Sequence, residues 1–230
     1  MAHALPAPGP VRVRWQKLHR IVASRHPPVD IFADLVAPAQ RELAWFLEGL
    51  TNDRLREQAG ETGLVAARDR VSGPGASVVL AAFTHIGRPT RFSDGSYGVY
   101  YGARSLETAV RETVYHRERF LRATAEAAGE IDMRVYIGRP LKPMHDLRAP
   151  VFAPLHDADD YRPSQAFARP WRAQGAWGFV YRSVRHAGGQ CIAAFRPPAV
   201  SIPVQGPHLA YVWTGERIDT VYEKSEPLFR

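Results

Sequence analysis

The chain has 230 residues, of which 45% are hydrophobic and 23% charged, a composition typical of a globular protein. Its one cysteine, Cys191, excludes an intrachain disulfide and a metal site built from several cysteines, and its formal net charge of +7 suits an anionic ligand, a nucleic acid or an acidic protein. No apolar stretch approaches the roughly 20 residues of a membrane helix, so we expect no membrane contact and a cytoplasmic location.

Residues 1–15 are rich in proline and lack a long apolar segment followed by a cleavage site. We therefore expect a flexible N-terminal tail, followed by a single domain over residues 16–230. The first strand is predicted at 16–23, and residues 30–59 have the pattern of a helical insertion. The run VVLAAFTH at 78–85 is apolar and rich in branched residues, which indicates a buried strand.

The centre of the chain combines a strand with a long helix. The strand is predicted at 98–103, and the helix begins after Ser105 and runs to about Ala127. Ser105 is a favourable N-cap residue, and Glu107 adds a negative charge to the first turn. The side of the helix expected to pack carries Leu106, Ala109, Val110, Thr113, Arg117, Phe120 and Leu121 at three- and four-residue spacing.

The remainder of the chain is predicted to be rich in strands. Further strands are predicted at 131–138, 177–184 and 190–195, and a hairpin at 209–223 has Thr214 and Gly215 at its turn. Proline and glycine cluster between residues 138 and 175, where we expect long surface loops. Strands around a helix without regular alternation indicate an α+β fold with a mixed, strand-rich sheet and flanking helices.

Three residues in this centre suggest chemistry on a dinucleotide. Arg91 lies in a loop before the strand, Tyr101 lies on the strand, and Glu112 lies on the helix at the margin of its apolar side. Tyr100 and Tyr101 point to opposite faces of a strand, so one of them belongs to the core. A guanidinium binds phosphate, an aromatic ring stacks on a base, and a carboxylate stabilises a ribosyl cation.

The same residues resemble the RES-domain family, which is named for an Arg, a Glu and a Ser. The family pattern has an Arg in a Gly-containing loop, a Tyr ten residues later and a Glu in an A-x-x-E segment, and these fall on Arg91, Tyr101 and Glu112. The second family block resembles GFVYRSVRHAGGQCIAAFRP, residues 178–197, and places the family Ser on Ser183. Two ordered blocks are far more specific than either alone.

The resemblance implies a fold similar to the ADP-ribosyltransferase toxins and a toxin that consumes NAD as a substrate rather than as a cofactor. The nicotinamide–ribose bond would be cleaved by phosphorolysis, with phosphate as co-substrate, or by hydrolysis. Family members are usually paired with an Xre-type antitoxin that carries its own DNA-binding domain. For this chain we therefore expect an antitoxin, no direct contact with nucleic acid, and a homo-oligomer or a toxin–antitoxin hetero-oligomer.

Residue roles follow from the same resemblance. Arg91 would clamp the pyrophosphate, Tyr101 would stack on or shape the nicotinamide end, and Glu112 would stabilise the ribosyl cation. Ser183 would orient the substrate by a hydrogen bond, because no Ser-His-Asp set accompanies it that would make it a nucleophile. Arg20 and Arg185 are candidates for phosphate binding, although Arg20 also suits an edge-strand charge.

Other readings of the sequence remain open. The enzyme alternative is a mono-ADP-ribosyltransferase acting on a protein. The non-enzymatic alternative is a basic nucleic-acid-binding protein, which the even spread of basic residues disfavours. Cys191 is expected to be a buried core thiol. No metal site is expected, since the residues His145, Asp146, His156 and Asp157 have no recognisable ligand spacing.

Overall fold

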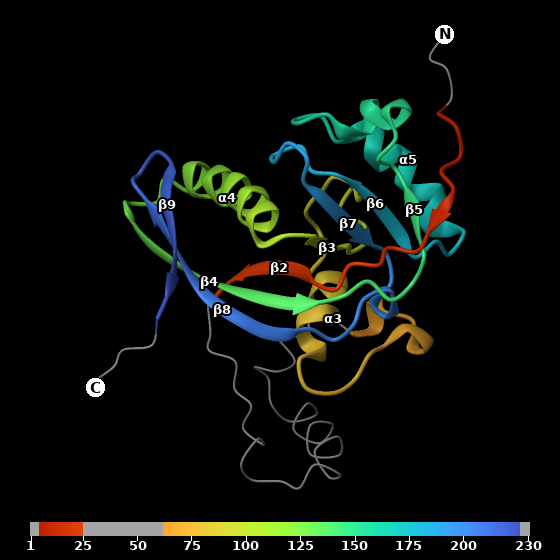
Figure 1. Ribbon diagram of the computed structural model, residues 1–230, viewed down its shortest axis with the longest axis horizontal. Coiled ribbons are helices and arrows are strands. Elements are labelled where there is room, and N and C mark those ends of the chain that lie inside the picture. The colour runs from red at the N-terminus through yellow and green to blue at the C-terminus, as the bar shows by residue number, and fades with distance from the viewer. Residues whose placement is uncertain (1–4, 25–61, 226–230) are drawn as a thin grey trace, which may run out of the picture.

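The fold is built on one mixed sheet (Figure 1). The computed structural model describes residues 5–24 and 62–225. Within them, nine strands form a sheet in the order β1-β5-β6-β7-β3-β2-β4-β8-β9. The pair β5–β6 is parallel and the other neighbouring pairs are antiparallel. With helices against this sheet, the predicted α+β class is confirmed.

The strands are β1 (Pro10–Val11), β2 (Leu18–Ala23), β3 (Tyr100–Ala103), β4 (Gly129–Gly138), β5 (Met144–Asp146), β6 (Gly178–Arg182), β7 (Gln190–Ala194), β8 (Val204–Trp213) and β9 (Ile218–Lys224). The α-helices described are α3 (Ala76–Thr84), α4 (Leu106–Ala123) and α5 (Arg162–Ala173). Short 3-10 helices are η2 (Thr62–Leu64), η3 (Ala67–Asp69), η4 (Pro150–His156) and η5 (Pro197–Ala199).

Most predicted elements are confirmed. Strands β2, β3, β4, β6 and β7 and helix α4 lie at the expected places, and β8 and β9 form the predicted hairpin. Its turn contains Gly215 at φ +100°, a conformation that glycine adopts without steric cost.

The prediction of a strand at 78–85 is wrong, because this segment belongs to helix α3. The helix starts after Gly75, which has φ +82°, and it buries residues at three- and four-residue spacing: Ala76, Val79, Leu80 and Phe83. A short apolar run has no periodicity that separates a buried helix from a buried strand. The backbone of α3 lies directly against Gly98, where a Cβ would fall 2.3 Å from the Cα of Phe83.

Two further expectations need correction. The segment 138–175, expected to be loops, contains β5, η4 and α5. Pro163 stands in the first turn of α5, where proline is tolerated, so it does not exclude a helix. The N-terminal stretch expected to be a flexible tail includes β1, which pairs with β5 through Pro10↔His145 and Val11↔Met144. The helical prediction at 30–59 lies outside the described residues.

The sheet is weakly paired at its middle, between β2 and β3. Strands β2 and β3 are joined by the single pair His19↔Ala103, whereas β2 pairs with β4 at six positions and β3 with β7 at four. Helix α4 follows β3 directly and contacts both β2 and β3. A weakly paired junction beside a helix leaves room for a cavity between strands of one continuous sheet.

Helix α4 depends on its N-cap, which gives a stability prediction. Ser105 Oγ accepts a hydrogen bond from the Thr108 backbone N–H at 3.2 Å. We expect Ser105→Ala to lower the free energy of unfolding by about 1 kcal/mol, measured by urea unfolding. The control is Ser72→Ala, at an exposed loop residue. Equal losses in the two variants would contradict the capping role.

Candidate functional site

A cavity of about 260 Å³ lies at the junction of β2, β3 and α4. Four of the sequence-predicted residues line it: Arg20, Arg91, Tyr101 and Glu112. They come from a strand, a loop, a second strand and a helix, so the fold brings together groups that are up to 92 positions apart along the chain. The cavity therefore combines guanidinium groups, an aromatic ring and a carboxylate in its lining.

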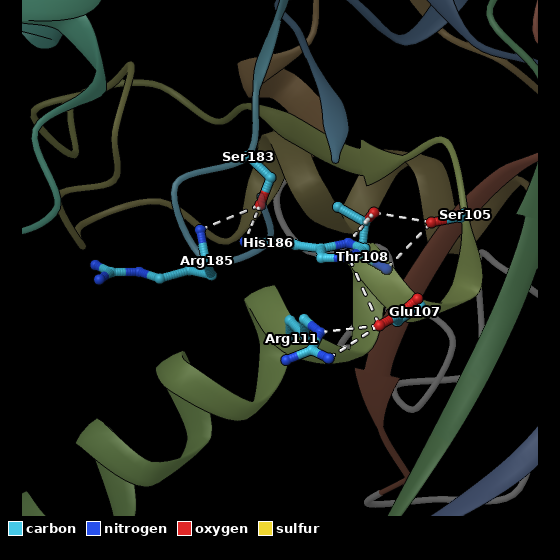
Figure 2. A network of polar contacts seen from close by, with 7 residues as sticks. All are labelled: Ser105, Glu107, Thr108, Arg111, Ser183, Arg185 and His186. Carbon is cyan, nitrogen blue, oxygen red and sulfur yellow. Dashed lines mark hydrogen bonds and ion pairs between the residues drawn. The ribbon is translucent and has the colours of Figure 1, made fainter. Parts of the chain in front are cut away.

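Glu112 is held by Ser183. The Ser183 hydroxyl donates to Glu112 Oε1 at 2.6 Å and accepts from the backbone N–H groups of Arg185 at 3.2 Å and His186 at 3.0 Å (Figure 2 shows the latter two contacts). The serine proton is thus directed at the carboxylate. Because its lone pairs accept two backbone donors, this hydroxyl is suited to fixing the carboxylate and not to attacking a substrate.

The turn that carries Ser183 is fastened to the start of α4. His186 Nδ1 lies 2.9 Å from Thr108 Oγ1, and its Nε2 lies 3.5 Å from Glu107 Oε1 (Figure 2). The ring of His186 therefore faces the helix and not Ser183. Gly189 permits this approach, since a Cβ there would fall 2.8 Å from the Thr108 side chain.

Arg91 is fixed from several sides. Its side chain is buried, with 7% of the residue exposed, and its Nη1 donates to the carbonyls of Leu155 at 3.2 Å and Asp157 at 2.7 Å. Its guanidinium lies 4.6 Å from the ring centroid of Tyr161. The hydroxyl of Ser164 donates to the Arg91 carbonyl at 2.5 Å. A charge held in this way binds a ligand without first losing side-chain entropy.

The two adjacent tyrosines separate as alternation predicts. Tyr100 is fully buried and Tyr101 lines the cavity. The Tyr101 hydroxyl lies 2.9 Å from Thr90 Oγ1 and accepts from the Phe92 N–H at 3.0 Å, so it braces the segment that carries Arg91. Burial raises the pKa of Tyr101, and raises that of Tyr100 to about 12, so both phenols are neutral near pH 7.

The two additional arginines have different positions. Arg20 lines the cavity, and its Nη1 donates to the Tyr101 carbonyl at 3.1 Å. Its Nε is buried without a hydrogen-bond partner among the described residues, and burial lowers the pKa of this guanidinium. Arg185 does not line the cavity: its guanidinium lies 3.3 Å from the Tyr115 ring centroid and donates to the Ala158 carbonyl. The prediction that Arg185 binds the ligand therefore has no support from this cavity.

Further cavity residues were not predicted. Tyr181 lies two positions before Ser183 and His116 lies one helical turn after Glu112, so strand and helix periodicity could have identified both. Tyr161 lies at the start of α5, in a segment expected to be loop, and no local signal marks it. Desolvation by the atoms around the ring, together with the charges of Arg185 and Arg91, lowers the pKa of His116 to about 4, although the residue is exposed.

Cys191 belongs both to the core and to this site. It is 3% exposed, lines the cavity, and has its Sγ 4.0 Å from Glu112 Oε1. Burial raises the pKa of the thiol well above its usual range, and the Glu112 carboxylate adds to this effect. A neutral thiol is a poor nucleophile, so we do not expect Cys191 to attack a substrate in this cavity.

Residues 5–24 and 62–225 contain no group of three or more His, Cys, Asp or Glu side chains arranged to hold a metal ion. No helix in the same ranges is long and apolar enough to cross a membrane.

Comparison with known proteins identifies relatives over most of the chain. The model of the RES domain matches residues 69–214. The uncharacterized protein y4oC of Sinorhizobium fredii is 30% identical over 213 residues, which cover 90% of this chain and 86% of that protein. A chain in the crystal structure of the M. tuberculosis MbcT–MbcA toxin–antitoxin complex has a TM-score of 0.43 and 12% identity, covering 91% of this chain and 87% of that chain.

Proposed function

The chain belongs to the RES-domain family, and from this premise we propose that it is the toxin of a toxin–antitoxin pair and cleaves the nicotinamide–ribose bond of NAD. The observation that carries the proposal is the Glu112–Ser183 pair at the wall of a cavity that also holds two guanidinium groups and the ring of Tyr101. A fixed carboxylate beside aromatic and cationic groups matches the charges of a dinucleotide during loss of its base.

The dimensions of the cavity suit one end of the substrate. At about 260 Å³, it is slightly smaller than the roughly 300–1,000 Å³ of ligand pockets in general. We assign it to the nicotinamide and its ribose, with the pyrophosphate towards Arg91 and Arg20. The aromatic rings of Tyr101 and Tyr181 then flank the base.

The reaction needs stabilisation of positive charge on the ribose. As the bond between C1′ and the pyridinium nitrogen breaks, its electrons neutralise the nicotinamide ring and leave an oxocarbenium-like ribose. The Glu112 carboxylate, oriented by the Ser183 proton, stabilises that charge. Attack of water on the same carbon (C1″ in ADP-ribose numbering), with loss of one proton, gives ADP-ribose, and attack of an anionic phosphate oxygen gives ADP-ribose 1″-phosphate.

The direct test is a time course of NAD incubated with the purified full chain, with and without phosphate, with products separated by chromatography. Nicotinamide release that requires phosphate identifies a phosphorylase, and release without it a glycohydrolase. Transfer of ADP-ribose to an added protein would instead support the transferase alternative. Unchanged NAD under all three conditions would reject the proposed activity.

Tyr101 provides a matched pair of variants. Tyr101→Phe removes the hydroxyl that bonds Thr90 Oγ1 and the Phe92 N–H. We expect kcat/KM for NAD to fall about tenfold, which corresponds to a loss of roughly 1.4 kcal/mol of transition-state stabilisation. Tyr100→Phe is the control, because the Tyr100 hydroxyl has no hydrogen-bond partner among the described residues. Equal activity in the two variants would exclude a positioning role for the Tyr101 hydroxyl.

The partner is proposed on family grounds. We expect an antitoxin of the Xre type to bind the toxin and suppress NAD cleavage. Co-expression with the neighbouring reading frame, followed by co-purification and an NAD assay of the complex, tests this expectation. A neighbour that fails to bind, or binds without inhibition, would contradict it.

A further inference from the structure

A second cavity, of about 270 Å³, shares no lining residue with the first. Segments from η2 and η3, the end of α3, the loop before β3, the end of α5 and the end of β7 form its walls. Its main side chains are Arg68, Arg172, Arg196, Tyr97, Phe83 and Phe195. The site is therefore a separate pocket with its own cationic and aromatic groups.

The acidic group of this pocket is already neutralised. Asp69 accepts two hydrogen bonds from Arg196, one from Nε at 2.8 Å and one from Nη2 at 2.6 Å. These bonds lower the pKa of Asp69, so the carboxylate stays ionised and paired. Arg196 is also fixed by Trp177, whose ring centroid lies 4.0 Å from the guanidinium carbon. The pair forms a rigid, nearly neutral side of the cavity.

Two guanidinium groups of the pocket form no direct ion pair within the described part of the chain, although the charge of Arg68 contributes to the lowered pKa of Asp69. Within residues 5–24 and 62–225, neither Arg68 nor Arg172 forms a salt bridge. Arg172 is instead held over Tyr97, with its guanidinium carbon 4.3 Å from the ring centroid. A guanidinium stacked on an aromatic face still has its N–H donors in its own plane, where they can bind an anion. The lining of the pocket therefore contains three arginines and one carboxylate, an excess of positive charge.

The rest of the lining is apolar. Phe83 and Phe195 are 6% and 3% exposed, whereas Leu64 and Ile86 at the pocket are 44% and 39% exposed. Exposed aliphatic side chains beside unpaired arginines favour an occupant with an apolar part and an anionic part. Guanidinium groups bind phosphate oxygens in pairs of hydrogen bonds, so phosphate is the anion that they match best.

We propose that this second cavity binds a small organic phosphate with an apolar group. The phosphate lies between Arg68 and Arg172, and the apolar group packs against Phe83, Leu64 and Ile86. The site is independent of the proposed NAD-cleaving cavity, and it exists whether or not NAD is the substrate there.

Tyr97 gives the pocket a connection to the segment that carries Arg91. Its hydroxyl donates to the Phe92 carbonyl at 2.6 Å, and its own carbonyl accepts from Ser93 Oγ at 2.5 Å. An occupant bound to Arg172 would disturb the stacking of this guanidinium on Tyr97. We therefore expect the Ser93 amide, which shares its peptide bond with the Phe92 carbonyl, to respond to binding together with the residues of the pocket itself.

The test uses phenyl phosphate as the probe, titrated into the full chain with backbone amide shifts as the readout. We expect a dissociation constant of about 1 mM or tighter, with the largest shifts at Leu64, Gly98 and Gly175, which line the pocket. Inorganic phosphate should bind about tenfold more weakly, since it lacks the apolar part. Equal affinity of the two probes would exclude the apolar subsite, and shifts confined to Gly102 in the first cavity would overturn the proposal.

Paired variants separate a built site from general charge attraction. Arg68→Ala with Arg172→Ala should weaken phenyl phosphate binding about tenfold or more. Arg139→Ala with Arg217→Ala removes the same charge from exposed residues that line neither cavity, and should leave the affinity unchanged. Equal weakening in both double variants would reject the site. The readout is binding alone, so it does not depend on NAD turnover.

Discussion

Glu112→Gln should lower kcat/KM for NAD cleavage by about 10²–10³-fold while the free energy of unfolding changes little. The substitution keeps the size of the side chain and leaves an oxygen that can still accept from the Ser183 hydroxyl, now 2.6 Å from Glu112 Oε1. It removes the negative charge that would oppose the ribosyl cation. The loss should therefore appear in kcat, because the interaction is strongest in the transition state.

The control for this prediction is a glutamate outside the site. Glu216 is an exposed residue of the β8–β9 turn that lines neither cavity, and Glu216→Gln should change kcat/KM by less than about twofold. Steady-state kinetics with NAD, together with urea unfolding of both variants, supplies the measurement. Full turnover in Glu112→Gln would reject its catalytic role. A parallel loss in Glu216→Gln would show that loss of any negative charge, and not of the Glu112 carboxylate in particular, carries the effect.

Elements with strong local signals were predictable from the sequence. Helix α4 has a capping serine, an acidic first turn and a packing face at helical spacing, and each of these acts within a few residues. The β8–β9 hairpin has alternating side chains around a glycine turn. For such segments, the local preference and the tertiary environment agree, and the residue pattern suffices.

The wrong predictions, a strand at 78–85 and loops at 138–175, concern segments whose secondary structure depends on tertiary packing. The apolar residues of α3 suit a strand as well as a helix, and only packing against Gly98 and the sheet distinguishes them. Helix α5 carries prolines that suggest a loop, but its Phe167 and Trp171 pack against Phe179 of the sheet, with ring centroids 5.8 and 6.4 Å away. These contacts join a helix to a strand that follows it in the chain, and the residue pattern of α5 alone does not reveal them.

The residues of the candidate site also fall into those placed by local structure and those placed by long-range topology. Arg91, Tyr101 and Glu112 lie within 22 residues, in the order loop, strand, helix, so their approach follows from local structure once the elements are known. Tyr161 reaches the cavity from the start of α5, and Cys191 reaches it through the pairing of β7 with β3. These residues depend on long-range topology. Arg185 fits the family pattern, but its guanidinium lies on the ring of Tyr115 and does not line the cavity.

A large loss of stability is expected from substitution of Gly178, the first residue of β6. Gly178 has φ +146°, and a Cβ there would lie 2.1 Å from the Ala193 carbonyl oxygen and 2.9 Å from the Ala194 Cα. Both contacts are with the backbone of the neighbouring strand β7, which cannot move without breaking its pairing with β3. We expect Gly178→Ala to lower the free energy of unfolding by about 4 kcal/mol, combining backbone strain with overpacking.

Two other glycines separate these causes. Gly175 has φ +83° with nothing within 4 Å of a Cβ, so Gly175→Ala measures strain alone, about 1 kcal/mol. Gly9 has neither a positive φ nor a close neighbour, so Gly9→Ala should be nearly neutral. Urea unfolding of the three variants should give losses in the order Gly178, Gly175, Gly9. Equal losses at Gly178 and Gly175 would mean that β7 yields to the added methyl group. The glycine would then be needed for its conformation rather than for the close approach of β6 and β7 that sets Tyr181 and Ser183 beside Glu112.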